Sequence, residues 1–328
     1  RSELWNLPRY IKSLKVAKIL SKQQRLRSHK MRLFHSRKEA LRAVACALVV
    51  FDFALYFLFV FLIGRSPVLS RHKEMSAFCV VCLYNMCGIT FLGLLHWPSV
   101  PSTNGNGSQL FVRHPAAETL GVLQFSFQFF DLIQCFVVPG MNKPEMVVHH
   151  AIVTYVAWQV FDGGVMHEPS LFFLGACEIQ SVPLTIIDFF THVPPSTFGA
   201  DLASRRVAES IFEVAKYVFA VLFFYSRIWL WMKHTAAFIL NATKALKMAH
   251  AKKEDDTDGR ATAYDTATKE AAGEGGRVAA AAKSVAARQL AEKHSATVAV
   301  FLAGLTLITA LQLWWGGKIL HEGYKILA

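Results

Sequence analysis

Acidic residues and cysteines are both scarce in this 328-residue sequence. Asp and Glu number 23 against 35 Lys and Arg, and there are six cysteines. All six cysteines fall within apolar stretches, a distribution unlike the framework of a small disulfide-rich extracellular domain. Cys79 and Cys82 form a C-x-x-C pair, but no second pair or nearby histidine accompanies them. We expect them to be small buried residues and not a zinc site.

Several catalytic motifs are missing as well. No H-x-x-x-H spacing occurs, which argues against the multiple histidine boxes of membrane desaturases and hydroxylases. Met146 stands where the H-x-x-H-H box of elongases needs its first histidine. No G-x-S-x-G is present, so the sequence lacks the nucleophile elbow of a serine hydrolase. Neighbouring side chains such as His149 and His150 diverge by about 100° on a helix, so this pair alone predicts no metal, and no cofactor is expected.

Long apolar runs are what the sequence has in abundance. Residues are 53% hydrophobic and the mean hydropathy is +0.33, too apolar for a soluble domain of this length. A helix needs about 20 apolar residues to cross a bilayer. The runs therefore predict an all-α fold, a polytopic transmembrane helical bundle. Seven segments are expected, at 41–63, 76–96, 117–138, 146–162, 169–190, 208–231 and 296–315. The fourth is short and polar enough to be re-entrant, so six crossings are the alternative.

Positive charge is concentrated at the start of the chain. Residues 1–40 form a basic arm with few acidic residues, and the whole chain has a formal net charge of +12. The arm leads directly into an apolar run, so we expect it to meet anionic lipid headgroups or an acidic protein partner, and not nucleic acid. Basic flanks stay on the cytosolic or matrix side of a membrane, which predicts the same side for the N-terminus. The arm also has the composition of a transit peptide, which makes the mitochondrial inner membrane one expected location.

Changes in composition divide the chain into four regions. The regions are the arm at 1–40, the first six segments at 41–231, a charged and Ala-rich loop and helix extension at 232–295, and the last segment with its tail at 296–328. Within the third region, residues 250–276 have the polar composition of a flexible linker. From Arg277 onward the sequence favours one unbroken helix that continues into the last segment.

Ionisable side chains inside the apolar segments mark the candidate site, because each is costly in a membrane. The stretch "VVHHAIVTY" carries His149 and His150, and the neighbouring segments add Asp131 and Glu178. If the protein is an enzyme, these four are the candidate catalytic residues, with one histidine as a general base and a carboxylate to orient it. The alternative is structural, with Asp131 or Glu178 hydrogen-bonding the histidines between helices.

Other polar residues recur at helical spacing on the same segments, so they must face the interior of the bundle. They line either a lipid pocket or a packing seam, and they are Gln124, Gln128, Thr154, Ser181, Thr185 and Asp188. Asp52 and Asn85 are each expected to form hydrogen bonds between helices. Arg227, with tryptophans close behind it, indicates a position at the membrane interface.

Five blocks of sequence, in this order, resemble the TLC-domain family, which includes the translocation-associated membrane protein, the ceramide synthases and several lipid-linked proteins. The blocks are "FQFFDLIQ", "VVHHAIVTY", "CEIQSVPLTIID", "VLFFYSRIWL" and "LQLWWGGKILHEGYKIL". The resemblance covers residues 44–231 and 296–328 and is closer to the small members that are not synthases. It implies a TLC-like bundle and a location in the endoplasmic reticulum.

The resemblance implies lipid binding or lipid homeostasis. Ceramide synthases carry a second aspartate where this chain has Cys177, Glu178 and neutral residues downstream, so the sequence does not predict catalysis. Two alternatives stay open. One is an accessory subunit of a larger membrane complex, for example in the mitochondrial inner membrane, that has retained the fold. The other is a ceramide-synthase-like N-acyltransferase with acyl-CoA as its co-substrate.

Overall fold

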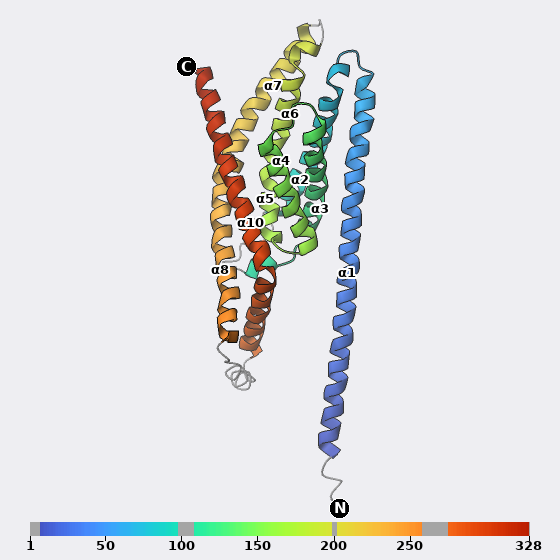
Figure 1. Cartoon of the computed structure of the whole chain (residues 1–328), viewed down its shortest axis with the longest axis vertical. Helices are drawn as coiled ribbons and strands as arrows, with labels where there is room; N and C mark the ends of the chain where they lie inside the picture. The colour runs from blue at the N-terminus through green and yellow to red at the C-terminus, as the bar shows by residue number, and fades with distance from the viewer. Residues whose placement is uncertain (1–6, 98–107, 199–201, 258–274, 328) are drawn as a thin grey trace, which may run out of the picture. The chain divides into compact units, whose positions relative to one another are not determined.

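Helices make up all the regular structure in the described part of the chain, so the predicted all-α fold class is confirmed. The computed structural model describes residues 7–97, 108–198, 202–257 and 275–327. Figure 1 shows these helices in chain order. The chain divides into two units, residues 1–44 and residues 45–328, and each is described by itself.

The first unit belongs to a single long helix. Helix α1 runs from Leu7 to Gly64, and its first part forms the unit of residues 1–44. Its apolar part, from Ser36 to Gly64, is long enough to cross a membrane. The predicted basic arm and the first predicted segment therefore share one helix without a break.

Within the described residues, five helical stretches are long and apolar enough to span a membrane, and they match predicted segments one, two, three, five and seven. They are Ser36–Gly64, Ser70–His96, Pro115–Val137, His167–His192 and Glu292–His321. In the most apolar 18-residue window of each stretch, 61% of the residues of Pro115–Val137 and 67% of those of His167–His192 are buried, against 11% of those of Ser36–Gly64. These two segments are therefore the interior of the bundle, where polar side chains can meet.

The other two predicted segments are helical but fall outside this group of five. Segment 146–162 corresponds to α4 (Pro144–Trp158), which has only 15 residues and is followed by a π-helical turn, η5 (Gln159–Gly163). Segment 208–231 corresponds to α7 (Leu202–Leu222) and a π-helical stretch, η8 (Phe223–Leu230).

Helices α2 (Lys73–His96) and α3 (Pro115–Val137) form the centre of the second unit. Helix α3 packs along α4 and also against α2, and Figure 1 shows these helices side by side. Both α3 and α4 begin with a proline, whose fixed φ suits the first helical turn. Phe127 and Phe130 of α3 are almost fully buried in the apolar core.

The fifth predicted segment is broken in the middle. It consists of α5 (His167–Phe173), a 3₁₀ helix η6 (Ala176–Gln180) and α6 (Ser181–His192). Pro183 lies in the first turn of α6, where its missing N–H is tolerated. The break places Glu178 in η6, and irregular backbone at membrane depth is tolerated where protein buries it.

Two glycines bring α2 into backbone contact with this break. A Cβ atom added to Gly93 would lie 2.3 Å from the Ala176 nitrogen and 2.4 Å from the Gly175 carbonyl carbon. A Cβ added to Gly175 would lie 2.7 Å from the Gly93 Cα. Small residues at membrane helix interfaces permit such close approach, so these two positions fix how α2 meets η6.

The region 232–295 is largely helical. Helix α8 (Trp231–Thr257) continues from η8, and α10 (Gly275–Leu327) includes the whole last segment. Figure 1 shows α8 and α10 running side by side. Trp231 Nε1 donates to Thr309 Oγ1 at 2.9 Å, which joins the two helices. The unbroken helix expected from Arg277 is confirmed, whereas most of the predicted linker lies outside the described residues.

Short 3₁₀ helices occupy the connections. They are η2 (Ser70–His72), η4 (Ser108–Phe111) and η7 (Pro195–Phe198).

A closed polar cluster of Asp52, Asn85 and Ser126 joins α1, α2 and α3. Asn85 Nδ2 donates to Asp52 Oδ1 at 3.1 Å, and Ser126 Oγ donates to Asp52 Oδ2 at 2.7 Å. All three side chains are buried. The predicted helix-to-helix hydrogen bonds of Asp52 and Asn85 are confirmed, and the two residues bond to each other.

Candidate functional site

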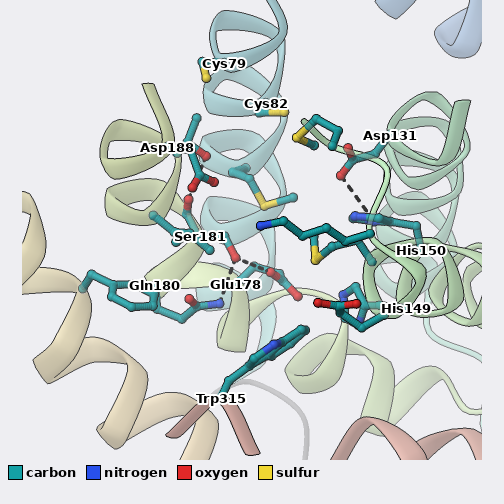
Figure 2. Close-up of a pocket in the computed structure, with 18 of the residues that line it drawn as sticks. Cys79, Cys82, Asp131, His149, His150, Glu178, Gln180, Ser181, Asp188 and Trp315 are labelled. Carbon is teal, nitrogen blue, oxygen red and sulfur yellow. Dashed lines mark hydrogen bonds and ion pairs between the residues drawn. The ribbon is translucent and has the colours of Figure 1, made fainter. Parts of the chain in front are cut away.

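A cavity of about 440 Å³ lies among α2, α3, α4, η6, α6, η8 and α10. Figure 2 shows its labelled polar side chains converging from several of these helices. The lining includes the charged or titratable residues Lys143, Glu178, His192, Arg227 and Lys318. Phe78, Met86, Phe127, Phe219 and Phe223 are among its apolar lining residues. The cavity therefore offers both charged and apolar walls.

His150 of α4 is held against α3. Its Nδ1 atom lies 2.6 Å from Gln128 Oε1 and 3.3 Å from Asp131 Oδ2. Nδ1 therefore faces two oxygen atoms that can accept a hydrogen bond from it, and Nε2 has no hydrogen-bond partner among the described residues. Figure 2 shows the Asp131–His150 contact. The sequence placed these residues on neighbouring segments, and the structure brings them together.

Four polar atoms on the lining side chains have no hydrogen-bond partner among the described residues. They are His149 Nδ1, His150 Nε2, Asp131 Oδ1 and Gln312 Oε1. His149 packs edge-to-face on Trp315, with ring centroids 5.8 Å apart. Buried polar atoms are normally paired, so this concentration of unpaired atoms around one cavity suits a polar ligand.

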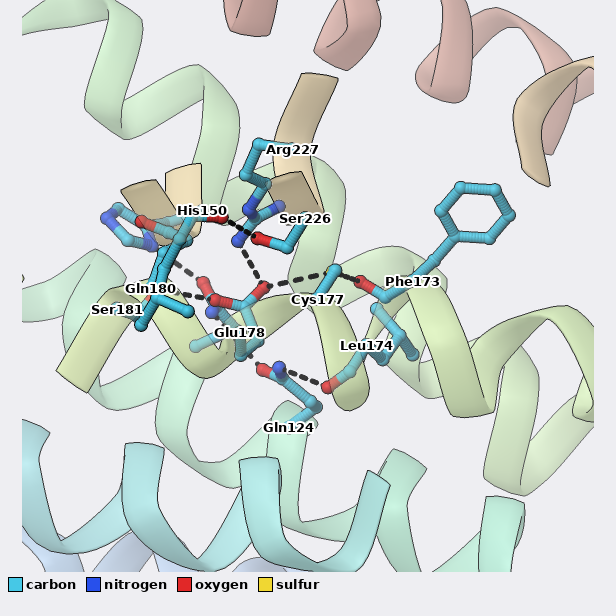
Figure 3. A network of polar contacts seen from close by, with 12 residues as sticks. Gln124, His150, Phe173, Leu174, Cys177, Glu178, Gln180, Ser181, Ser226 and Arg227 are labelled. Carbon is cyan, nitrogen blue, oxygen red and sulfur yellow. Dashed lines mark hydrogen bonds and ion pairs between the residues drawn. The ribbon is translucent and has the colours of Figure 1, made fainter. Parts of the chain in front are cut away.

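Glu178 has a different partner from the one predicted. Its Oε1 atom lies 2.6 Å from Arg227 Nη2, and its Oε2 accepts from Ser181 Oγ at 2.6 Å. With its amide oxygen facing the guanidinium, Gln180 also accepts from Arg227 Nε at 3.0 Å. Figure 3 shows this network. Of the two acids expected beside the histidines, only Asp131 contacts them, because Arg227 takes up the Glu178 carboxylate.

Arg227 does not extend to an exposed position, as a side chain at the membrane interface was expected to do. Its side chain is only 5% exposed and lies in η8 against Glu178. The sequence signal was available, since an arginine between "FFYS" and "IWLW" needs an acidic partner at membrane depth. The tryptophan pattern behind it favoured the interface instead.

The remaining predicted pocket residues divide into two groups. Gln128, Ser181, Thr185 and Asp188 line the cavity. Gln124 and Thr154 do not. Gln124 is fully buried and donates to the Leu174 carbonyl at 2.7 Å, and Thr154 Oγ1 donates to the His150 carbonyl at 2.7 Å. Gln124 and Thr154 therefore belong to packing contacts and not to the pocket lining.

Sequence reasoning also missed several lining residues. Gln312 and Trp315 reach the cavity from α10, which is distant in sequence, and Gln180 lies beside the Glu178–Arg227 pair. Lys318 is also a lining residue, and its Nζ atom is 3.6 Å from the centroid of the Trp314 ring. Only a tertiary contact reveals these positions, because local periodicity on α10 gives no information about α4.

Two histidines outside the membrane segments and the cavity are held as neutral structural groups. Burial lowers the pKa of His234, which stacks on Phe172 with ring centroids 4.0 Å apart. Burial also lowers the pKa of His114, with a smaller contribution from His96. The His114 backbone N–H donates to His167 Nδ1 at 2.7 Å. These rings support the packing and do not extend the site.

Three residues beside the cavity have the donor set of a metal site, and two of them, Asp131 and His150, also line the cavity. Asp131, Cys135 and His150 each present a ligand atom, and these atoms lie within 4.8 Å of one another. All three side chains are buried. Cys135 did not figure among the predicted site residues, because His150 belongs to another helix and only the tertiary contact brings the two together.

The fold and cavity together define a polytopic α-helical membrane protein with a polar pocket inside its bundle. The TLC-domain profile matches residues 74–321, which is more than half of the chain and includes every cavity residue. The chain therefore belongs to the TLC-domain family. The match begins after α1 and extends to residue 321. No curated protein and no solved structure matches the chain.

Proposed function

We propose that the protein binds a membrane lipid, headgroup first, in the cavity between α3, α4 and α10, and that it acts in lipid homeostasis. The observation that carries this proposal is the set of unpaired polar atoms of Asp131, His149, His150 and Gln312 around one cavity. A ligand that lacks polar groups leaves these atoms unsatisfied, and a ligand without an apolar part leaves the phenylalanine wall in contact with polar atoms.

The size of the cavity supports the same ligand class. Ligand pockets in proteins commonly measure roughly 300–1,000 Å³, and this one is about 440 Å³. That volume accommodates a headgroup and part of an acyl chain. Lys143 and Lys318 give the lining positive charge, and Asp188 and Glu145 give it negative charge, so the lining suits a headgroup that is polar at several points.

Lipids that copurify with the protein test this proposal. The protein is purified in mild detergent, and its bound lipids are identified by mass spectrometry against the lipids of the source membrane. We expect one lipid class to be enriched, and we expect His150→Phe to abolish the enrichment because the apolar ring removes Nε2 from the cavity. Thr154→Val is the matched control, because Thr154 is also on α4 but lies outside the lining. Equal lipid profiles for all three proteins would contradict lipid binding here.

An N-acyltransferase is a second candidate, supported by the Asp131–His150 pair. With Nδ1 facing Gln128 and Asp131, the Nε2 lone pair is available in the cavity to take a proton from an attacking amine. Glu178 takes no part, because Arg227 and Ser181 occupy its oxygens. Incubation with acyl-CoA and a long-chain amine tests the reaction. No product, or product that survives both His149→Ala and His150→Ala, excludes it.

The basic arm supports a third candidate, an accessory subunit that retains the TLC fold. Such a subunit uses residues 1–40 to meet anionic headgroups or an acidic partner. The two expected compartments, endoplasmic reticulum and mitochondrial inner membrane, are separated by imaging a tagged full-length chain. Extraction in mild detergent and a native gel then test assembly: a monomer excludes a stable complex.

A further inference from the structure

We propose that Asp131, Cys135 and His150 form a binding site for a divalent metal ion, with Zn²⁺ as the best match. One donor atom from each residue lies within 4.8 Å of the other two. Carboxylate, thiolate and imidazole are the three ligand types that zinc uses in proteins. Mg²⁺ and Ca²⁺ prefer oxygen ligands throughout, so the thiol and imidazole exclude them as the natural occupant. The proposal goes beyond lipid binding, because it assigns an ion to the wall of the cavity.

The backbone places these three residues on facing helix surfaces. Asp131 and Cys135 are four residues apart on α3, so they share one face of that helix. His150 approaches from α4, which packs along α3. The three side chains are buried, with residue exposures of 6%, 0% and 5% respectively. Two rigid helices therefore fix the relative positions of the three donors.

Charge compensation favours an ion at this position. A carboxylate buried in an apolar bundle is costly unless it is paired. The Asp131 carboxylate meets only His150 as a possible cation within 4 Å among the described residues, and its Oδ1 atom has no hydrogen-bond partner there. A divalent cation with one carboxylate and one thiolate is neutral overall, and the ion itself promotes loss of the thiol proton. Binding thus removes the uncompensated charge.

The residues around the three donors have the features of a metal site. Gln128 Oε1 contacts His150 Nδ1 at 2.6 Å, and Gln128 Nε2 donates to Gln124 Oε1 at 3.2 Å. Gln124 is in turn anchored on the Leu174 carbonyl. Such outer hydrogen bonds orient a ligating histidine. Asp131 and His150 also line the cavity, so an ion held by these residues would lie next to it.

Cobalt binding tests the site without any assay of activity. The purified full-length protein is treated with a chelator, freed of it, and titrated with Co²⁺ in detergent. A thiolate ligand gives Co²⁺ a charge-transfer band in the near ultraviolet. We expect this band at one ion per chain, and we expect Zn²⁺ to displace it. Cys135→Ser should abolish the band, and Asp131→Asn and His150→Gln should each weaken binding by more than about 100-fold, because loss of a ligand exceeds loss of an outer-shell partner.

Two cysteine variants serve as controls. Cys82→Ser removes a buried thiol from the facing helix α2, and Cys46→Ser removes an exposed one from α1. Both should keep the band. Absence of the band in the wild type, its survival in Cys135→Ser, or its equal loss in a control overturns the proposal. If circular dichroism shows that Cys135→Ser does not fold, the cobalt band and the number of bound ions are measured in Asp131→Asn instead. An unchanged band there overturns the proposal, and a weakened band supports it. Lipid copurification measured on the same chelated protein shows separately whether the proposed lipid binding holds.

Discussion

Two buried polar clusters in this bundle each centre on an aspartate, but they differ in whether both carboxylate oxygens have a partner. Around Asp52, both carboxylate oxygens accept a hydrogen bond, from Asn85 and from Ser126. Around Asp131, one oxygen contacts His150 and the other has no partner among the described residues. The Asp52 cluster is absent from the cavity lining, whereas Asp131 and His150 form part of it.

We infer that the Asp52 cluster holds helices together, whereas the Asp131 cluster has polar atoms that a ligand can satisfy. A fully satisfied network stabilises and orders its surroundings, whereas a partly satisfied one carries a cost. The Glu178–Arg227 pair combines both features, since it lines the cavity yet its charges are matched. Substitutions in the Asp52 cluster and the Glu178–Arg227 pair should therefore mainly lower stability, whereas substitutions in the Asp131 cluster should mainly reduce ligand binding.

The largest effect on stability is expected at the buried ion pair. Arg227→Met leaves the Glu178 carboxylate buried without its cation, and breaking such a pair costs about 3–5 kcal/mol. Thermal unfolding in detergent, followed by circular dichroism, measures the loss. The double variant Arg227→Met with Glu178→Leu should recover most of it. An unchanged unfolding temperature in the single variant would mean that the pair contributes no net stability.

The next largest effect is expected where two backbones touch. Gly93→Ala places a methyl group 2.3 Å from the Ala176 nitrogen, so α2 must move away from η6, and the unfolding free energy should fall by about 3 kcal/mol. Gly88→Ala is the matched control on the same helix, because no atom lies within 4 Å of its added Cβ. Both variants are compared by thermal unfolding. Equal stability of the two would show that the Gly93 contact is not close-packed.

Removing the closed cluster should cost less. Asp52→Ala strands the Ser126 hydroxyl and one bond of the Asn85 amide, which predicts a loss of about 2 kcal/mol. Binding of lipid and of Co²⁺ should be unchanged in the folded fraction. A melting curve measures the loss of stability, and Scatchard analysis of the cobalt band measures the binding of Co²⁺. A stable variant with impaired binding would reverse the roles assigned to the two clusters.

The smallest loss of stability is expected from the equivalent change in the cavity. Asp131→Ala should cost less than about 1 kcal/mol, because one oxygen is unpaired and Gln128 still accepts from His150. The same variant should lose cobalt binding. The melting curve and cobalt titration of Asp52→Ala provide the direct comparison. A cost above that of Asp52→Ala would show that Asp131 is mainly structural.

The sequence predicted much of the fold because apolar runs and helix breakers are local signals. Five of the seven expected segments are long, apolar helices, and the unbroken helix from Arg277 into the last segment is present. The Asp131–His150 contact was also within reach, since both residues are costly in a membrane and lie on segments next to each other in sequence. Burial of polar groups limits the choice of partners.

The misses concern pairing between distant elements. Local periodicity predicts no more than that Glu178 and Arg227 face the interior of the bundle. Their contact depends on the break at η6 and on the π-helical η8, which the periodicity does not predict. Cys135 looked like any small apolar residue until α4 placed His150 beside it. Gln124 and Thr154 satisfied the helical pattern yet bond to nearby carbonyls. A stripe of polar residues does not distinguish a pocket wall from a packing contact.

The π-helical stretch Phe223–Leu230 makes the ion pair depend on chain length as well as on composition. A π-helix holds more residues in each hydrogen-bonded turn than an α-helix. Loss of one residue just before Arg227 is compensated if the stretch becomes a regular α-helix, but the same change of helix type without that deletion turns the guanidinium away from Glu178. Every side chain of the ion pair would still be present in the sequence, yet Glu178 would lose its partner.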